Sequence, residues 1–386
     1  MSTLSLAVDR LLTLGTTGHH PASAIAGVRT DSGTEVEAGG WAKLPVGDAP
    51  GVPMARETLL DLASVTKVAS TTTLAMRLVA AGQLSLEAPA RRYLPDFDGE
   101  GKDGVTVEQL LTHTAGLPPW WPLYCETRDR DTALERAQAL PLAAKPGTEW
   151  RYSDLGLILA GHIVERITTL NLADAFRRLV AEPLGLTAVY GPVPAERAAA
   201  GGDSDAYEFG MIATGEPHPV PFTTDSFTGW RRGELRGVAN DGNAAHALGG
   251  VAGHAGLFAT VDDLLTLGAA VRGGDLVPHA VLARFATPNA VHPEQAVGFR
   301  CRRLEVGGQA LTVLHHGGFT GTFLALAIER ELVVAGGAMR LYGTLGPIPA
   351  SLTGPTGGTA PDVTGLVPGT DIQGVLLDAA REALAD

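Results

Sequence analysis

Lysine is scarce in this chain of 386 residues: the only four are Lys43, Lys67, Lys102 and Lys145, and arginine supplies most of the positive charge. The formal net charge is −13, and no run of basic residues occurs. A phosphate polymer needs a concentrated basic surface on its protein partner. We therefore expect no nucleic-acid partner.

Cysteine and long apolar runs are also missing. Cys125 and Cys301 are the only two cysteines, which excludes a disulfide framework and favours free thiols in a reducing compartment. No apolar run is long enough to span a bilayer. The first residues, MSTLSLAVDRLLTLG, are interrupted by Asp9 and Arg10 and indicate an amphipathic helix rather than a signal peptide. We expect a soluble, cytoplasmic protein without a membrane partner.

Apolar residues make up 45% of the chain and charged residues 18%, so a sizeable core can form in two domains or one large composite fold. Hydrophobic periodicity and turn residues predict the elements. Helices are expected over 4–15, 68–82, 155–167, 172–180, the segment capped by Thr260, and the last 16 residues; strands are expected over 23–29, 34–42, 311–315, 323–329 and 332–338. The Gly/Pro-rich segment 346–369 is expected to be an irregular connection.

Helix and strands occur at both ends of the chain, with helices between them. The economical α/β fold, of α+β type, is an antiparallel sheet flanked by terminal helices, with an inserted all-α domain. We expect residues 1–63 and 290–386 to form the sheet domain and residues 64–289 the mainly helical insert. The cleft where the two domains meet is a favoured place for a site.

The stretch DLASVTKVAS, residues 61–70, places one of the rare lysines three residues after a serine. On a helix these positions share a face, so the Ser64 hydroxyl and the Lys67 amine can come within hydrogen-bond distance. A serine nucleophile needs a base, and burial among small apolar neighbours would lower the pKa of the lysine towards that of a base. Alone, the pattern also suits a solvated helix lysine.

Two further polar groups could complete a site. Tyr152-Ser153-Asp154 precedes the apolar helix expected at 155–167, and a tyrosine beside a lysine can pass protons to a leaving group. The alternative is a core aromatic residue followed by a helix-capping aspartate. The sequence HHGGFTG, residues 315–321, lies between two expected strands, where glycines let a substrate approach backbone N–H groups. An ordinary glycine-rich hairpin is the alternative there.

Together, Ser64-x-x-Lys67, Tyr152-x-Asp154 and the His-x-Gly that begins at His316 resemble the class C β-lactamase family and its esterase, D-amino peptidase and transacylase relatives. The segments RYLPDF (92–97), LLTHTAGL (110–117) and GGVAGHAGLFAT (249–260) also look like family segments. The resemblance covers roughly residues 20–340. Because no lysine follows position 145, the third motif cannot be Lys-Thr-Gly.

The resemblance implies a sheet domain with an inserted helical domain and an acyl-enzyme mechanism. By position, Ser64 would be the nucleophile, Lys67 its base and Tyr152 the proton shuttle. His316 would be the polar, substrate-facing residue of the third motif, and the backbone N–H groups of Ser64 and Phe319 would form the oxyanion hole. The substrate-binding residues would be Asp154, Gly317, Gly318, Trp120 and Trp121.

Two departures from the family pattern bear on the substrate. Asp154 stands where β-lactamases usually carry asparagine, so an acceptor-only carboxylate replaces an amide. His316 replaces a lysine and so weakens the positive charge that would hold a substrate carboxylate. Both changes predict weak or absent β-lactamase activity and favour ester-type acyl substrates. The role of Arg340, which could reach the cleft, stays open.

The sequence gives weaker evidence for the remaining candidate site residues. Trp120 and Trp121 are adjacent and cannot easily both face the core, so at least one is expected to line an acyl pocket. His113 is expected to pin a loop. His246 and His254 stand apart without a His-x-x-x-His or Cys-His cluster, so no metal is expected.

The function expected from these observations is serine-dependent acyl transfer that hydrolyses an ester or amide of a small molecule, without a cofactor. An alternative is a transacylase that passes the acyl group to an amine or alcohol in natural-product biosynthesis. A second alternative is a non-catalytic binding or sensor protein that kept the fold. A monomer or small homo-oligomer is expected.

Overall fold

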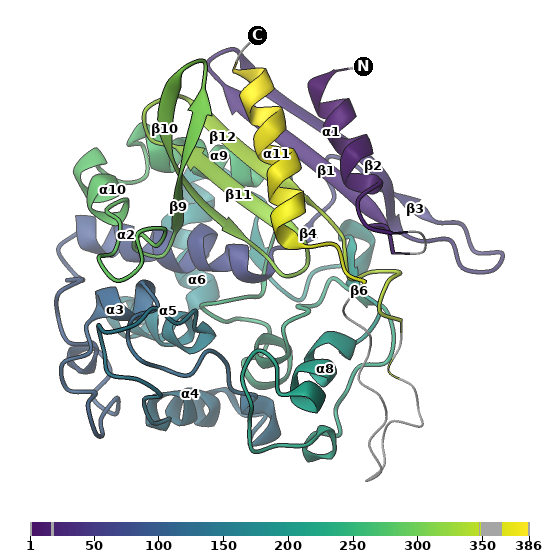
Figure 1. The fold of residues 1–386 in the computed structure, drawn as a ribbon. Helices are drawn as coiled ribbons and strands as arrows, with labels where there is room; N and C mark the ends of the chain where they lie inside the picture. Colours follow the sequence, from purple (N-terminus) through teal and green to yellow (C-terminus); the bar gives the residue numbers. More distant parts are fainter. Residues whose placement is uncertain (1, 17–18, 347, 349–364, 385–386) are drawn as a thin grey trace.

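The computed structural model describes residues 2–16, 19–346, 348 and 365–384, and Figure 1 shows their arrangement. Most of the predicted connection over 346–369 lies outside the described residues. The helices are α1 Thr3–Leu12, α2 Thr73–Ala80, α3 Val107–Leu111, α4 Arg130–Ala139, α5 Asp154–Thr168, α6 Leu172–Phe176, α7 Glu182–Leu184, α8 Ala206–Thr214, α9 Val261–Gly273, α10 His279–Phe285 and α11 Gly369–Ala383. The strands are β1 Ser23–Thr30, β2 Gly33–Lys43, β3 Val52–Pro53, β4 Leu60–Asp61, β5 Val189–Tyr190, β6 Ala200–Gly202, β7 Leu235–Arg236, β8 Leu257–Ala259, β9 Arg300–Val306, β10 Gln309–Gly317, β11 Thr322–Ala327 and β12 Leu332–Ala338.

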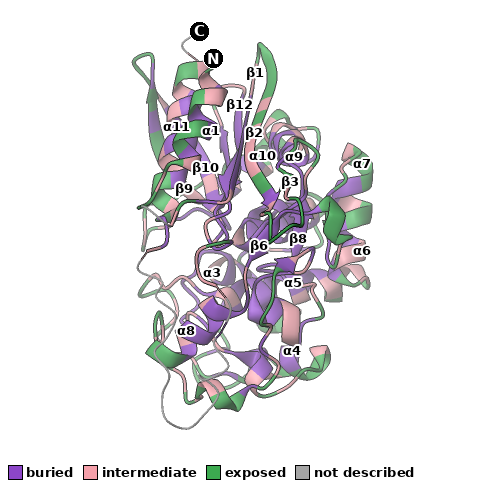
Figure 2. Ribbon diagram, turned by 90° about the vertical axis from the view of Figure 1, so that its right-hand side faces the viewer, coloured by how far each residue is buried: buried purple, intermediate pink, exposed green. Residues whose placement is uncertain are grey.

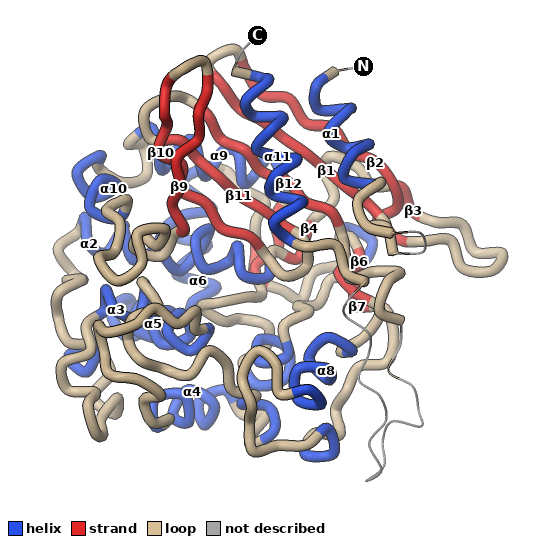
Figure 3. Tube along the Cα trace, in the orientation of Figure 1, coloured by secondary structure: helices blue, strands red, loops and turns tan. Residues whose placement is uncertain are grey.

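The main sheet joins strands from the two ends of the chain. Its seven strands run in the order β3-β2-β1-β12-β11-β10-β9, and every neighbouring pair is antiparallel. The central pair brings the first strand of the chain against the last, with Ala26 opposite Gly336. The α/β fold class and the antiparallel sheet are thus as predicted. Figure 3 shows the strands gathered in the upper half and helices with long loops in the lower half.

Both faces of this sheet are covered. Helices α1 and α11 pack on one face through Leu4, Leu11 and Leu376, against strand residues such as Phe323. Helix α9 packs on the other face, where Leu264 belongs to a second and larger core that continues into the helical half. Figure 2 shows the sheet between these two layers. Because both faces are covered, every residue of β11 and β12 is buried, and all but Thr322 are apolar or glycine.

Several local predictions can be compared with the observed elements. Thr260 caps α9, and its hydroxyl accepts from the Asp263 N–H in a capping box, which confirms that prediction. The predicted helix over 68–82 begins as a π-helical turn, η2 Lys67–Thr72, before α2. Strand β9 was not expected, because its exposed positions carry arginine at an edge of the sheet.

The predicted division at residues 63/64 and 289/290 stays a prediction. Helix α9 falls within the range assigned to the insert, yet it packs on β1, β11 and β12 of the sheet. In the described part of the chain, no single helix is long and apolar enough to cross a membrane. The bent pair formed by α5 and the segment Leu172–Leu184 passes that test only by length and composition.

Candidate active site

Ser64 lies in a tight turn that follows strand β4. The turn is a single 3-10 segment, η1 Ala63–Val65, and Ala63 has a φ of 44°, a conformation that is costly for a residue with a side chain. The buried carboxylate of Asp61 holds the turn, because its Oδ1 accepts from the Ala63 N–H at 3.0 Å and its Oδ2 accepts from the Asn240 N–H at 2.7 Å. Ser64 is thereby presented half-exposed at the wall of a pocket.

Lys67 lies directly behind the serine. Its Nζ donates to Ser64 Oγ at 2.7 Å, forms an ion pair with Asp154 Oδ1 at 2.7 Å, and donates to the His254 carbonyl at 3.4 Å. The lysine side chain is fully buried. The structure therefore places the predicted nucleophile and its predicted base in direct contact, with a carboxylate on the far side of the amine.

The pKa of Lys67 is raised rather than lowered, which corrects the direction expected from the sequence. Burial is the largest single influence and lowers it, but the charges of Asp154 and Tyr152 and their hydrogen bonds together raise it by more. The expectation considered only the apolar neighbours in sequence and not the carboxylate that the fold brings beside the amine. Lys67 is consequently an ammonium ion in the free protein.

Tyr152 completes this group from the other side of the lysine. Lys67 Nζ lies 5.0 Å from the centre of the Tyr152 ring. Burial raises the pKa of the phenol, and although the charge of Lys67 and hydrogen bonds from Lys67 and Ser64 act in the opposite direction, the pKa stays above its usual value. Tyr152 is therefore a neutral phenol in the resting protein. It can donate its proton but cannot act as a base until it has lost it.

The segment that carries Tyr152 and Asp154 is held by three hydrogen bonds. The Ser153 N–H donates to His113 Nδ1 at 3.0 Å, the Ser153 hydroxyl donates to the Pro118 carbonyl at 2.6 Å, and the Asp154 N–H donates to the Pro119 carbonyl at 3.0 Å. Asp154 is the first residue of α5, and its carboxylate faces Lys67 rather than the end of its own helix. His113 thus pins this loop.

The third predicted motif lies at the end of β10. A Cβ on Gly318 would stand 2.6 Å from the Leu62 carbonyl, so only glycine lets this loop approach the nucleophile turn. The Thr320 hydroxyl donates to the Asp61 carbonyl at 3.0 Å and ties the two segments together. The Phe319 N–H makes no hydrogen bond within the described residues and its residue lines the pocket beside Ser64. An oxyanion hole formed by these two N–H groups stays a prediction.

His316 does not face the pocket. It is 3% exposed, and one ring nitrogen, Nδ1, lies 2.8 Å from the Gly317 carbonyl, to which it donates. Burial and the nearby charge of Lys67 lower its pKa far below the usual value, so the imidazole is neutral. A neutral His316 supplies no positive charge to a substrate carboxylate. It is not among the residues that line the pocket, and its contact with substrate stays a prediction.

The pocket in front of Ser64 has a volume of about 600 Å³. Trp120 lines it, whereas Trp121 does not: its indole N–H donates to Glu126 at 2.9 Å and its ring contacts Phe222. Of the two tryptophans that were both expected to bind substrate, the fold places only Trp120 at the pocket. The other lining residues are Pro119, Trp150, Arg151, Tyr152, Asp154, Tyr207, Glu208, Met211, Pro217, Asp241, Gly317, Gly318, Phe319, Arg340, Gly369 and Gln373.

Two acidic residues of this pocket, Glu208 and Asp241, were not predicted from the sequence. Glu208 accepts from the Tyr124 hydroxyl at 2.8 Å and from the Gly242 N–H at 2.9 Å. Burial, followed by the charge of Asp241, raises the pKa of Glu208 to about 8. The pKa of Asp241 is lowered: burial opposes this, but the charge that His254 carries when protonated and the hydrogen bond from its ring outweigh burial. The sequence signal that could have indicated Asp241 is the pair of polar residues in DGNAA, residues 241–245, among glycine and alanine.

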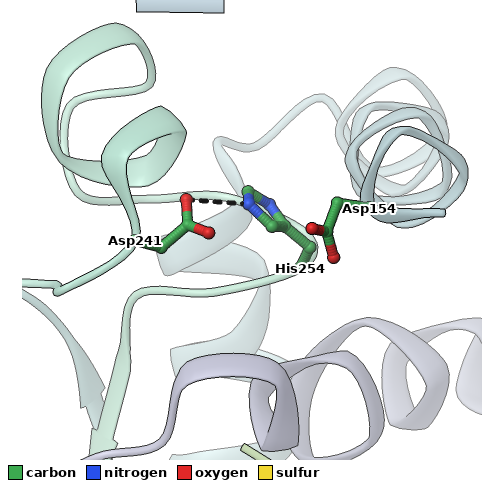
Figure 4. Close-up of side chains that lie close together, drawn as sticks. All are labelled: Asp154, Asp241 and His254. Atoms are coloured by element: carbon green, nitrogen blue, oxygen red, sulfur yellow. Dashed lines mark hydrogen bonds and ion pairs between the residues drawn. The ribbon is translucent and has the colours of Figure 1, made fainter. Parts of the chain in front are cut away.

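Asp241, His254 and Asp154 form a compact group next to Lys67. His254 Nε2 lies 2.9 Å from Asp241 Oδ1, and one potential ligand atom from each of the three residues lies within 4.8 Å of the others. Figure 4 shows the His254 ring between the two carboxylates. Among the described residues this is the one group of histidine and acidic side chains close enough to hold a metal ion, although no metal was expected.

Comparison with known proteins agrees with this geometry. A model of the Beta-lactamase family matches residues 8–344. The chain is 30% identical over 270 residues to N-acetylmuramyl-L-alanine amidase of Bacillus subtilis (strain 168), an alignment that covers 64% of this chain and 58% of the relative. It is 41% identical over 155 residues to Esterase EstB of Burkholderia gladioli, covering 35% of this chain and 39% of that protein. The chain thus spans about half the length of these curated relatives.

A solved structure extends the similarity over almost the whole fold. The crystal structure of a family VIII carboxylesterase superposes with a TM-score of 0.69 and 20% sequence identity, covering 98% of this chain and 96% of the other. At that identity the superposition shows a shared fold.

Proposed function

This chain belongs to the Beta-lactamase family, and we propose that it is a serine hydrolase that cleaves an ester or amide bond of a small acyl substrate through an acyl-enzyme on Ser64. The observation that carries the proposal is the 2.7 Å contact between Ser64 Oγ and the buried Lys67 Nζ at the wall of the pocket. The amidase and esterase among the relatives support hydrolysis in general.

The reaction follows from the placement of these groups. Ser64 Oγ attacks the substrate carbonyl while its proton leaves along the contact with Lys67, an ammonium ion that must release one of its own protons as it takes this one. The oxyanion that forms lies near the Phe319 N–H. Tyr152, a protonated phenol beside Lys67, donates to the leaving group. Water then attacks the acyl-enzyme by the reverse proton path.

The position of Arg340 favours a substrate that carries a carboxylate. It lines the pocket, and its guanidinium donates to the carbonyls of Phe319 at 2.8 Å and Val367 at 2.5 Å. Within the described part of the chain no carboxylate lies within 4.0 Å of it, and burial lowers its pKa. A partly buried guanidinium without a counter-ion favours an anionic ligand.

We expect Arg340→Gln to raise KM at least tenfold for a substrate with a carboxylate and by less than threefold for its methyl ester. Equal changes in KM for the two substrates would contradict this.

The acyl acceptor in this proposal is water. Transfer to an amine or alcohol is the alternative, and hydroxylamine or an alcohol added to the acylated protein distinguishes the two. An increase in turnover with formation of the amide or ester product supports transfer.

We propose that β-lactam hydrolysis is weak or absent, because His316 is neutral and the Asp154 carboxylate is paired to Lys67.

The direct test is covalent labelling of Ser64. The folded protein is incubated with a fluorophosphonate or with p-nitrophenyl acetate, and intact-mass and peptide mass spectrometry locate the adduct. We expect a single adduct on Ser64 and none in Ser64→Ala. A folded protein that forms no adduct, or an adduct that survives in Ser64→Ala, would overturn the proposal and favour a binding protein that kept the fold.

A further inference from the structure

Neither predicted base is ready to accept a proton in the resting protein. Lys67 carries its full charge beside Asp154, and Tyr152 holds its phenolic proton. The rings of His113 and His316 lie 4.6 Å and 6.0 Å from the Tyr152 ring, and neither histidine makes a hydrogen bond to Lys67 or Ser64 among the described residues. An ammonium ion can take the Ser64 proton only if it gives up another proton. The site therefore needs an acceptor beyond Lys67.

We propose that Asp154 is this acceptor, and that His254, held by Asp241, keeps the transferred proton in place. The proposal rests on the serine hydrolase function and adds one catalytic residue and two positioning residues to it. The Asp154 carboxylate is in direct contact with the amine, because its Oδ1 lies 2.7 Å from Lys67 Nζ. The two atoms are in contact, although no Lys67 hydrogen bond is directed at Asp154 Oδ1 in the resting geometry.

The histidine is built to accept a hydrogen bond. His254 Nε2 donates to Asp241 Oδ1 at 2.9 Å, and that carboxylate is itself held by the Ala244 N–H at 2.8 Å. In its neutral form, a ring that donates through Nε2 has its lone pair on Nδ1, so the contact with Asp241 fixes the tautomer of that form. His254 is 1% exposed, and its Nδ1 has no hydrogen-bond partner among the described residues. A buried acceptor without a donor is costly and rare in folded proteins.

A protonated Asp154 would supply the missing donor. A carboxylate oxygen of Asp154 and a ring nitrogen of His254 lie within 4.8 Å of each other, and the two side chains face one another in Figure 4. While Asp154 is ionised, it and Nδ1 are both acceptors and cannot bond. Once Asp154 carries a proton, a change in its side-chain torsion lets its O–H donate to Nδ1. The Asp241–His254 pair therefore stabilises the neutral form of Asp154 selectively.

The proton balance of acylation is then complete. The Ser64 O–H bond breaks as the Oγ–carbon bond forms, and the carbonyl π electrons move to oxygen. Lys67 receives the serine proton and at the same time releases one of its own to Asp154, so the lysine remains an ammonium ion. When the leaving group departs, Tyr152 donates to it and is reprotonated by Lys67, which recovers its proton from Asp154. No group outside the site is required.

The same three side chains also match a divalent cation by residue type. Such an ion would compete with the Lys67 ammonium for Asp154, and two cations that share one buried carboxylate repel each other. The observed ion pair therefore favours a proton relay over a metal site. Metal binding is kept as an outcome of the test.

The experiment is a double-mutant cycle on the rate of acylation. Burst kinetics with p-nitrophenyl acetate yield the acylation rate constant and the apparent dissociation constant separately. We expect His254→Phe to lower the rate constant about 100-fold without changing the dissociation constant. In an Asp154→Asn background Lys67 loses its counter-ion, burial then favours the neutral amine, and acylation stays measurable. There His254→Phe should change the rate less than threefold, since no carboxylate remains to be protonated.

His246→Phe is the matched control, because His246 makes a second histidine–aspartate contact, part-buried, to Asp205 at 2.9 Å and without a contact to Lys67 among the described residues. We expect its acylation rate within twofold of the parent. Equal losses for His254→Phe in both backgrounds, or no loss in either, would overturn the relay. One equivalent of zinc per chain, with acylation abolished by a chelator, would replace it with a metal site. In each case labelling of Ser64 in the unmodified protein separately reports on the hydrolase function.

Discussion

The protonation state of Lys67 depends on a single carboxylate. Burial by itself would favour the neutral amine, but the ion pair with Asp154 at 2.7 Å holds the pKa of Lys67 above its ordinary value. A carboxamide at position 154 would remove the charge of Asp154, the largest influence that opposes burial, and leave only Tyr152 to oppose it. Whether position 154 carries a carboxylate or a carboxamide thus determines whether Lys67 can act alone as the base or needs a further proton acceptor.

Glu208 provides a residue-scale prediction on stability. Its pKa in the folded protein is about 8 against an ordinary 4.5, so the folded state binds a proton that the unfolded chain has lost at neutral pH. The stability gained from that proton is fully present below pH 4.5 and is lost as the pH rises through 8. Glu208→Gln stays neutral at every pH, and the Tyr124 hydroxyl can turn to accept from its amide.

We therefore expect the free energy of unfolding, measured by urea titration between pH 5 and pH 9, to fall more steeply in the parent than in Glu208→Gln. The difference should reach a few kcal/mol at pH 9. Parallel curves for the two proteins would show that Glu208 is ionised in the folded state.

Among the elements, α5 determines how close the acidic residues come to Lys67. This helix begins with Asp154, and its glycines allow other segments to touch its backbone. A Cβ on Gly156 would stand 2.6 Å from the Leu110 carbonyl, and one on Gly161 would stand 2.9 Å from Gly253 Cα. Gly253 directly precedes His254, so this contact fixes the separation of Asp154 and His254.

Replacement of Gly253 tests this contact. A Cβ at Gly253 would lie 2.0 Å from the Leu157 carbonyl, which is backbone and cannot move aside cheaply. We expect Gly253→Ala to lower the free energy of unfolding by about 1–3 kcal/mol and to slow Ser64 acylation. Gly104→Ala is the control, because a Cβ there would meet nothing within 4 Å. Equal stability of the two variants would show that the helix can shift without cost.

At the scale of the whole molecule, two cores meet at a sheet whose strands come from both ends of the chain. Folding buries His113 and His316 and half-buries His315. Burial lowers the pKa of His113 and of His315 to about 3, and that of His316 further still. All three are neutral in the folded protein at neutral pH. In the unfolded chain they titrate near 6.5.

These histidines predict acid lability. For a base whose folded pKa is depressed, the stability is fully present above the unfolded value of 6.5 and is lost as the pH falls towards 3. His113→Asn isolates one of them: its amide oxygen can accept from the Ser153 N–H, and asparagine tolerates the φ of 59° at this position. We expect this variant to lose stability less steeply between pH 6 and pH 4, by about 1.4 kcal/mol per pH unit. Thermal unfolding across that range measures it, and an unchanged slope contradicts the assignment.

Local spacing in the sequence was enough to predict the antiparallel sheet with terminal helices, the Thr260 cap and the Ser64–Lys67 contact. Each depends on residues a few positions apart, or on hydrophobic periodicity, and the backbone geometry of helices and strands converts such spacing directly into proximity. The charge of Lys67, the burial of His316, the separation of Trp121 from the pocket and the Asp241–His254 pair followed only from the tertiary structure. A counter-ion or a dielectric environment depends on which distant segments pack together, and α5 and the loop before β8 are placed by close backbone contacts that no local pattern encodes.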